Sequence, residues 1–153
     1  MKIAGVDPST LPAVETLVFP RDGQFIVFTA RGLPDLDEFE ALCPLPTPPA
    51  KMTPKGITPD LDDKGYLSVM DEWNKRRISY FIVKSLEPSE IEWDTVKMDQ
   101  PNTWANWSID LKNGGFSKAE CNLVFNLCFS ANSLDEDKLK AARESFRHGQ
   151  QGA

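Results

Sequence analysis

Apolar and polar residues alternate in two short stretches near the start of the chain. The stretches "ETLVFP" (Glu15 to Pro20) and "QFIVFTA" (Gln24 to Ala30) are rich in the β-branched and aromatic residues typical of strands. They flank "RDG", in which Gly23 can adopt the positive φ of a tight turn. The pattern predicts a β-hairpin. Because a hairpin alone is only marginally stable in water, we expect another element to cover its apolar face.

The spacing of apolar residues then changes to that of a helix. In "DLDEFEALC", Asp35 is a candidate N-cap, and acidic residues fill the first turn. Leu36 and Phe39, with Leu42 or Cys43, fall on one face. This short helix is a candidate cover for the hairpin.

A dense group of prolines follows the short helix. Residues 43–59 contain six of the twelve prolines in the chain. Prolines end a helix and hold the chain extended, so the stretch predicts a semi-rigid strap between two units. An alternative interpretation is that "PTPPAK" (Pro46 to Lys51) is a Pro-x-x-Pro ligand for the aromatic groove of another protein.

The second half of the chain predicts helices. Residues 62–87 form one long helical pattern that ends at Pro88, and its expected buried side consists of Met70, Trp73, Ile78, Tyr80, Phe81, Ile82 and Leu86. Residues 91–98 are expected to be an extended link. A further helix is predicted in 99–115, with Pro101 in its first turn and Gly114 or Gly115 at its end.

Two more helices complete the pattern. Ser117 and Glu120 have the spacing of a capping box, so a helix is predicted to begin there. The last helix is expected to run from Ser133 or Leu134 to Gly149. Its predicted inner face consists of Leu139, Ala142 and Phe146.

These elements predict an α+β fold. The expected units are a small N-terminal β-hairpin unit (1–42), a proline-rich extended strap (43–63), a mainly α-helical bundle of about four helices (64–149) and a flexible tail (150–153).

Composition and charge narrow the classes of function. Hydrophobic residues make up 41% of the chain and charged residues 26%, which is typical of a folded protein. The net charge of -6 disfavours binding to nucleic acid or to anionic lipid, and no apolar run reaches the ~18 residues of a membrane span. We therefore expect neither partner.

Few residues are suited to catalysis or to metal binding. The chain has one histidine, His148, and three cysteines without Cys-x-x-Cys spacing. The carboxylates lack the spacing of a calcium loop, and no glycine-rich phosphate loop is present. We expect a protein that is not an enzyme, with no catalytic residues, no metal and no cofactor.

The pattern over Lys118 to Ser130 is the most informative for function. Lys118, Asn122, Asn126 and Ser130 form one narrow polar stripe, and apolar residues occupy nearly all remaining positions. Such a helix is either a central core helix or, in part, a surface for another chain. Trp104 and Trp107 on the preceding helix are likewise either core residues or interface aromatics. The candidate client-binding residues are Trp104, Trp107, Phe116, Leu123, Phe125, Leu127 and Phe129.

From about Tyr66 to Arg147 the chain resembles the tail assembly chaperones of long-tailed, siphovirus-type bacteriophages. The resemblance lies in "NTWANW", in "GFSKAE" at a helix start and in "ANSLDEDKLKAARESF", with "DEFEALCPLPTPP" upstream. It implies a non-virion protein of the host cell cytoplasm that binds the tape measure protein and keeps it soluble while tail tube subunits assemble around it. The alternatives are an acidic phage protein that inhibits a host protein, and a minor structural tail component.

An acidic protein with four tryptophans and a nearly all-apolar helix is also expected to self-associate, or to be stabilised by its client.

Overall fold

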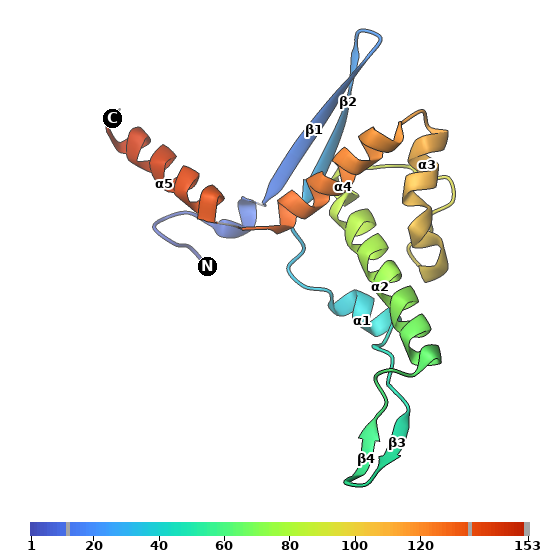
Figure 1. The fold of residues 1–153 in the computed structure, drawn as a ribbon. Helices are drawn as coiled ribbons and strands as arrows, with labels where there is room; N and C mark the ends of the chain where they lie inside the picture. Colours follow the sequence, from blue (N-terminus) through green and yellow to red (C-terminus); the bar gives the residue numbers. More distant parts are fainter. Residues whose placement is uncertain (12, 135, 152–153) are drawn as a thin grey trace.

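The computed structural model describes residues 1–11, 13–134 and 136–151. After a short 3-10 turn, η1 (Pro8–Thr10), strands β1 (Val14–Arg21) and β2 (Gln24–Arg31) pair antiparallel as predicted, with Val14 opposite Arg31 and Arg21 opposite Gln24 (Figure 1). Asp22 and Gly23 join the strands with φ of 45° and 78°. Two positive φ values are those of a type I′ turn, whose twist matches that of the strands.

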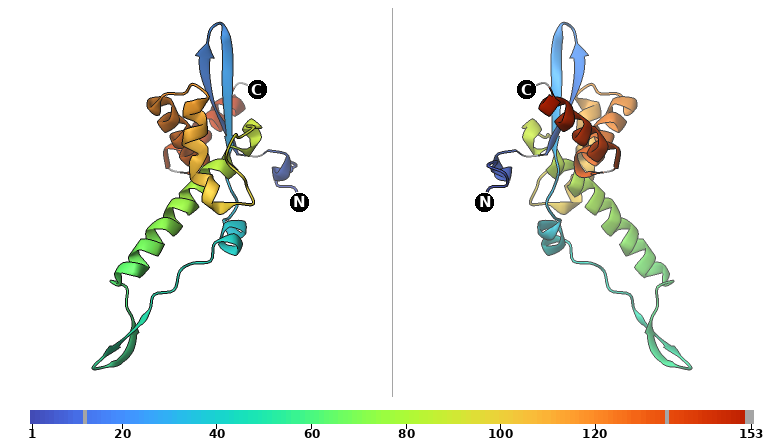
Figure 2. Two further views of the ribbon diagram at one scale, coloured as in Figure 1. Left: turned by 90° about the vertical axis from the view of Figure 1, so that its right-hand side faces the viewer. Right: turned by 90° about the vertical axis from the view of Figure 1, so that its left-hand side faces the viewer.

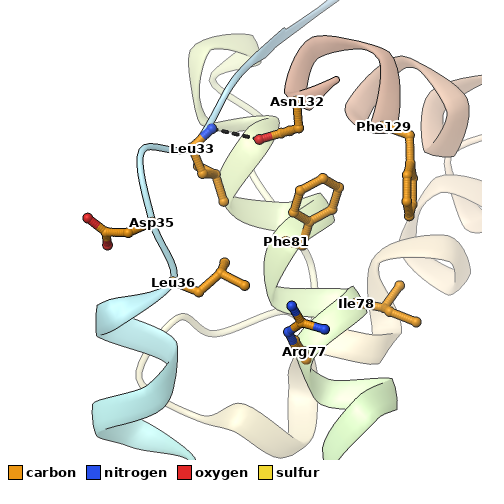
Figure 3. A pocket seen from close by; sticks show the side chains of 8 residues that line it. All are labelled: Leu33, Asp35, Leu36, Arg77, Ile78, Phe81, Phe129 and Asn132. Carbon is orange, nitrogen blue, oxygen red and sulfur yellow. Dashed lines mark hydrogen bonds between the residues drawn. The ribbon is translucent and has the colours of Figure 1, made fainter. Parts of the chain in front are cut away.

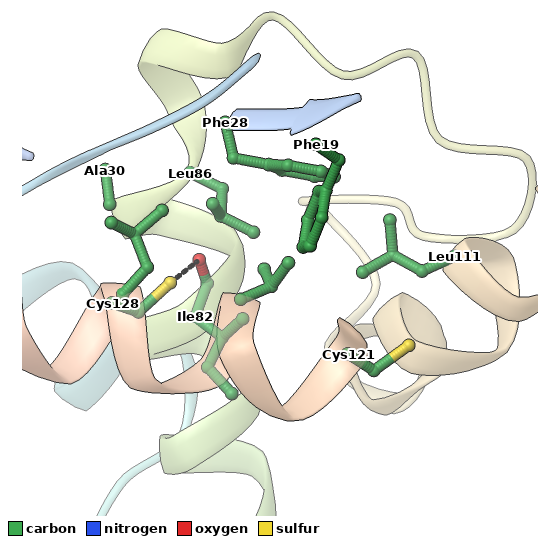
Figure 4. Close-up of a cluster of buried hydrophobic side chains, with 10 residues drawn as sticks. Phe19, Phe28, Ala30, Ile82, Leu86, Leu111, Cys121 and Cys128 are labelled. Carbon is green, nitrogen blue, oxygen red and sulfur yellow. Dashed lines mark hydrogen bonds between the residues drawn. The ribbon is translucent and has the colours of Figure 1, made fainter. Parts of the chain in front are cut away.

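The inner face of this hairpin is covered by α4 (Lys118–Asn132), rather than by the short helix that follows the hairpin in sequence. Figure 4 shows Phe19 and Phe28 of the hairpin next to α4 and to the end of α2 (Lys64–Ser85). The buried cluster consists of Phe19, Phe28, Ala30, Ile82, Leu86, Leu111, Cys121, Val124, Leu127 and Cys128. The hairpin and the helices therefore share one core, which we call the first cluster.

The short helix α1 (Asp37–Leu42) contributes to a second cluster instead. Its Phe39 is fully buried, and the ring centroid of Phe39 lies 5.4 Å from that of Trp73 and 5.6 Å from that of Tyr80. The buried members of this cluster are Phe39, Cys43, Tyr80, Val83, Val96 and Trp104. It fixes α1 against α2.

The proline-rich segment differs from the extended strap that its composition predicts. Residues 44–49 have no helix or strand, but β3 (Ala50–Thr53) and β4 (Gly56–Pro59) then form a second antiparallel hairpin. Gly56 has a φ of 117°, which only glycine adopts without strain, and it follows the two-residue turn at 54–55. The chain therefore reverses at a turn formed by Pro54 and Lys55 instead of continuing as an extended strap.

Helix α2 is the longest element. The Asp63 carboxylate accepts a hydrogen bond from the Tyr66 amide at 2.8 Å and caps its start. Figure 2 shows that the first half of α2 projects away from the core toward the β3–β4 hairpin. Its second half packs into both clusters, and the 3-10 turn η2 (Glu87–Ser89) follows.

The link at 91–98 has no helix or strand, as predicted. Asp110 holds it in place, because the Asp110 carboxylate accepts hydrogen bonds from the amide and hydroxyl of Thr95 at 2.9 and 2.7 Å. The helix predicted in 99–115 is a 3-10 segment, η3 (Pro101–Asn106), continued by α3 (Trp107–Asn113).

The last two helices differ in how far they are packed. Helix α4 starts at the predicted capping box, with reciprocal Ser117 and Glu120 hydrogen bonds of 3.1 and 3.0 Å. Helix α5 (Glu136–Gln151) instead projects from the core (Figure 1). Its predicted inner face is not an inner face, since Leu139 and Phe146 are 40% and 65% exposed. Of the predicted tail, Gln150 and Gln151 belong to α5, and 152–153 lie outside the described residues.

Candidate functional site

Helix α4 turns only part of its apolar surface toward the core. Its buried side chains are those of Cys121, Val124, Leu127 and Cys128. Leu123 and Phe129 are instead exposed, at 47% and 46%. Phe129 follows Leu123 by six positions, so the two side chains lie roughly 120° apart around the helix. They belong to two different surfaces.

Five of the seven residues predicted to bind a client lie in or against the core. Four of them contribute to the fold alone, and the fifth, Phe125, also adjoins the pocket described below. Trp104 is fully buried, and its indole N–H donates to the Met98 carbonyl at 3.3 Å. Leu127 is buried in the first cluster. Trp107 is half-buried and packs against both clusters. These residues support the fold, and the candidate surface described below does not include them.

Phe116, the fourth of these residues, closes the end of the first cluster. Its ring lies 5.7 Å from Phe19 and 5.3 Å from Phe28, between centroids. The Arg21 guanidinium stands 5.4 Å from the same ring and forms an ion pair with Glu120. Phe116 therefore joins the hairpin to the start of α4.

Phe129 borders a pocket of about 230 Å³, formed by the segment after β2, by α2 and by α4. Figure 3 shows its side chains around the opening. The lining residues are Leu33, Asp35, Leu36, Arg77, Ile78, Phe81, Phe129 and Asn132. We call this site the α2–α4 pocket.

Three phenylalanine rings form one wall of the α2–α4 pocket and extend it along α4. The Phe129 ring lies 5.2 Å from that of Phe81 and 4.7 Å from that of Phe125. Ile78, one turn before Phe81 on α2, is also exposed. Aromatic rings bury a large area and lose few rotamers on binding, so such a wall is suited to holding an apolar side chain.

Asn132 fixes the back of the α2–α4 pocket. Its side-chain oxygen accepts a hydrogen bond from the Leu33 amide at 2.7 Å (Figure 3). Its side-chain nitrogen donates to the Ser85 hydroxyl at 3.0 Å and to the Cys128 carbonyl at 2.7 Å. Three segments are thus held in register around the opening. The Asn132 side chain thus connects the walls of the pocket.

The rim of the α2–α4 pocket carries one charge of each sign. The Asp35 carboxylate accepts a hydrogen bond from the Asp37 amide at 3.0 Å. The Arg77 guanidinium lies 5.9 Å from the centroid of Trp73, and it has no ion pair within the described residues. A bound segment with an acidic residue beside its apolar side chain would find a partner in Arg77.

The size of the α2–α4 pocket favours a side chain over a cofactor. Small-molecule sites usually have volumes of about 300–1,000 Å³, and this pocket is smaller. Its lining is mostly apolar, with only Asp35 and Arg77 ionisable. Such a site can bind one or two apolar side chains from another protein.

Metal ligands and reactive thiols are not gathered elsewhere in the described part of the chain. Residues 1–11, 13–134 and 136–151 contain no group of three or more potential metal ligands. All three cysteines are free and buried, and burial raises the pKa of the Cys128 thiol to about 12. A nucleophilic cysteine needs a lowered pKa, so Cys128 is a core residue.

The sequence pattern did not single out half of this site. Ile78 and Phe81 were predicted to belong to the buried side of α2, and Leu33 was not part of any predicted element. The available signal was the width of the apolar surface on α2, which is more than one neighbouring helix can cover. Of the predicted residues, Phe129 borders the pocket, Phe125 adjoins it, and Leu123 lies on another surface.

Comparison with known proteins adds no relative. No protein-family model, no curated protein and no solved structure matches the chain. Within the described residues, none of the helices combines the length and the apolar character needed to cross a membrane.

Proposed function

We propose that this chain is a tail assembly chaperone of a long-tailed bacteriophage. It binds an apolar segment of the tape measure protein in the host cell cytoplasm and keeps that protein soluble while tail tube subunits assemble around it. The observation that best supports the proposal is the α2–α4 pocket, in which the exposed side chains of Ile78 and Phe129 flank the half-buried ring of Phe81.

The pocket fits a helical client better than an extended one. An amphipathic helix presents apolar side chains at intervals of three or four residues, and one such side chain can enter the pocket while the next contacts Phe125 along α4. The chain carries a net charge of -6. Charge of one sign keeps a complex soluble even when its client is apolar.

The proposal is tested by co-expressing the chain with the tape measure protein encoded in the same genome. Replacing Phe129 by Asp places a charge in the pocket, and loss of a hot-spot contact of about 2 kcal/mol weakens binding about 30-fold. We expect the soluble fraction of the tape measure protein, measured after centrifugation, to fall to the level seen without the chaperone.

Leu123→Asp is the matched control. Leu123 is as exposed as Phe129 on the same helix but faces away from the pocket, so this variant should keep the client soluble. Equal loss of soluble client with both variants would contradict a role for the pocket. A wild-type chain that leaves the client insoluble, or that is found in purified phage particles, would contradict the chaperone proposal itself.

A further inference from the structure

The two outer edges of the β1–β2 hairpin differ in whether their backbone N–H and C=O groups have hydrogen-bond partners. On the β2 edge, the Ser89 hydroxyl accepts a hydrogen bond from the Thr29 amide and donates one to the Thr29 carbonyl, both at 2.7 Å. Thr29 therefore directs its backbone groups away from β1. Ser89 covers the middle of the β2 edge.

The β1 edge lacks such a cover. Thr16 lies opposite Thr29 in a non-hydrogen-bonded pair. In such a pair, the N–H and C=O groups of both residues point away from the partner strand. The same holds for Val14 and Val18, two residues on either side. No other described residue bonds to the backbone N–H or C=O of Thr16 or Val18, and both side chains are exposed. Unpaired edges of this kind are templates for another strand.

The unpaired edge is self-complementary. Its outward positions read Val14, Thr16 and Val18, which is the same sequence in both directions about Thr16. We propose that β1 pairs antiparallel with β1 of a second copy around a two-fold axis at Thr16. Val14 then bonds to Val18 of the second copy and Thr16 to its own equivalent, which forms about six backbone hydrogen bonds.

The pairing also places like side chains side by side. On the outer face, Val18 lies between Val27 of its own hairpin and Val14 of the second copy, and Thr16 lies beside Thr16. Rows of valine and of threonine are favourable across strands. On the inner face, Glu15 falls opposite Leu17 of the second copy. The Glu15 carboxylate keeps its ion pair with Lys138, at 2.7 Å, so the pairing does not leave that carboxylate without a cationic partner.

Pro20 limits how far the pairing can extend toward the hairpin tip. Pro20 has no N–H, and it occupies the next outward position after Val18. A longer ladder toward the hairpin tip is therefore blocked. The inferred dimer uses β1 and leaves the α2–α4 pocket free, so it does not depend on the proposed client.

Disulfide trapping tests the register. In the inferred dimer the two Thr16 Cα atoms lie about 5.5 Å apart, within the range of a disulfide. The purified Thr16→Cys variant should form a covalent dimer on mild oxidation, seen by non-reducing electrophoresis. The matched control is Val18→Cys, whose two copies would be about 13 Å apart along the strands. The wild-type chain, oxidised in the same way, shows whether the three buried cysteines form any disulfide by themselves.

A second measurement does not depend on oxidation. The wild-type chain should have twice the monomer mass by light scattering, and Thr16→Pro should be monomeric because it removes the N–H at the two-fold axis. Pro20 shows that this edge accepts proline. Val27→Pro, at an outward position of the opposite edge, should remain dimeric. A monomeric wild type, or equal trapping at Thr16 and Val18, would overturn the inference.

Discussion

The side chain of Asn132, at the end of α4, accepts a hydrogen bond from the backbone amide of Leu33, ninety-nine residues earlier in the chain, at 2.7 Å. The same side chain donates to Ser85 on α2. One amide group thus joins the segment after β2 to two helices, and it forms the back of the α2–α4 pocket. The fold and the candidate site depend on it together.

Replacing Asn132 by Leu should destabilise the protein by about 1–3 kcal/mol, because the Leu33 amide and the Ser85 hydroxyl lose their partner. Urea unfolding followed by circular dichroism measures this as a lower midpoint with an unchanged slope. Asn126, exposed on the same helix, is the control, and Asn126→Ala should change stability by no more than about 0.5 kcal/mol. Equal effects of the two variants would show that the Asn132 bonds contribute little.

A side chain at Gly32 is expected to destabilise the fold. A Cβ atom at this position would lie 3.0 Å from the Ala131 carbonyl oxygen, which belongs to the backbone of α4 and cannot move aside alone. Gly32→Ala should therefore lower the melting temperature. Gly149 in α5 has open space around it, so Gly149→Ala should increase helix content and stabilise that helix by roughly 0.5–1 kcal/mol. A lower melting temperature for Gly32→Ala and a higher one for Gly149→Ala would confirm that position 32 is crowded and position 149 is open.

Substitutions of Trp104 and Phe129 should have different effects on the stability of the chain and on its binding to the client. Trp104 of η3 is fully buried against α1 and α2, so Trp104→Ala leaves a cavity and should cost about 3–5 kcal/mol of stability. Phe129 is 46% exposed, and Phe129→Ala should leave most of the stability intact while weakening client binding. Chemical denaturation and the co-expression assay together measure both quantities. A Phe129→Ala protein as unstable as Trp104→Ala would place Phe129 in the core.

The raised pKa of Tyr80 predicts that the stability of the protein falls at high pH. Burial, together with the Glu38 carboxylate that accepts its hydroxyl at 3.0 Å, raises the pKa of Tyr80 from 10.0 to about 12. A raised pKa means that the folded state favours the neutral phenol. Its contribution to stability is complete below pH 10 and is lost as the pH rises from 10 to about 12.

The expected result is a fall in the urea midpoint over that pH interval, which Tyr80→Phe should reduce. The chain has only two tyrosines, so Tyr66→Phe leaves Tyr80 as the single source of tyrosinate absorbance. In that variant the absorbance should appear near pH 12 and not near pH 10. Titration near 10 would contradict the hydrogen bond to Glu38.

The elements predicted with most success are those with a local cause. Asp22 and Gly23 form the turn of the first hairpin because both residue types can adopt the positive φ that the turn requires. Ser117 and Glu120 begin α4 because each bonds the other's backbone, three residues away. The α+β fold with a C-terminal helical region could be predicted for the same reason.

The second hairpin was missed because proline density dominated the interpretation of that segment. Met52 and Ile57 form a cross-strand pair, and the turn between them depends on Gly56. The residues 54–56, "PKG", carry a local turn signal, because proline presets φ for a turn and glycine accepts a positive φ. Prolines restrict only φ and one hydrogen bond, so they do not prevent a short hairpin whose strands carry proline at an end.

The sequence by itself determined where the chain turns, where its helices begin and which surfaces are apolar, since each of these depends on residues within a few positions of one another. Only the tertiary structure decided which apolar residues are core and which are surface. Val124 and Phe129 lie on the same helix and are both apolar, yet Val124 is buried under the hairpin and Phe129 borders the α2–α4 pocket. Leu139 and Phe146 likewise have the spacing of an inner face, but no element of the described chain covers them. Burial depends on which distant segments pack against a helix, and no pattern within the helix contains that information.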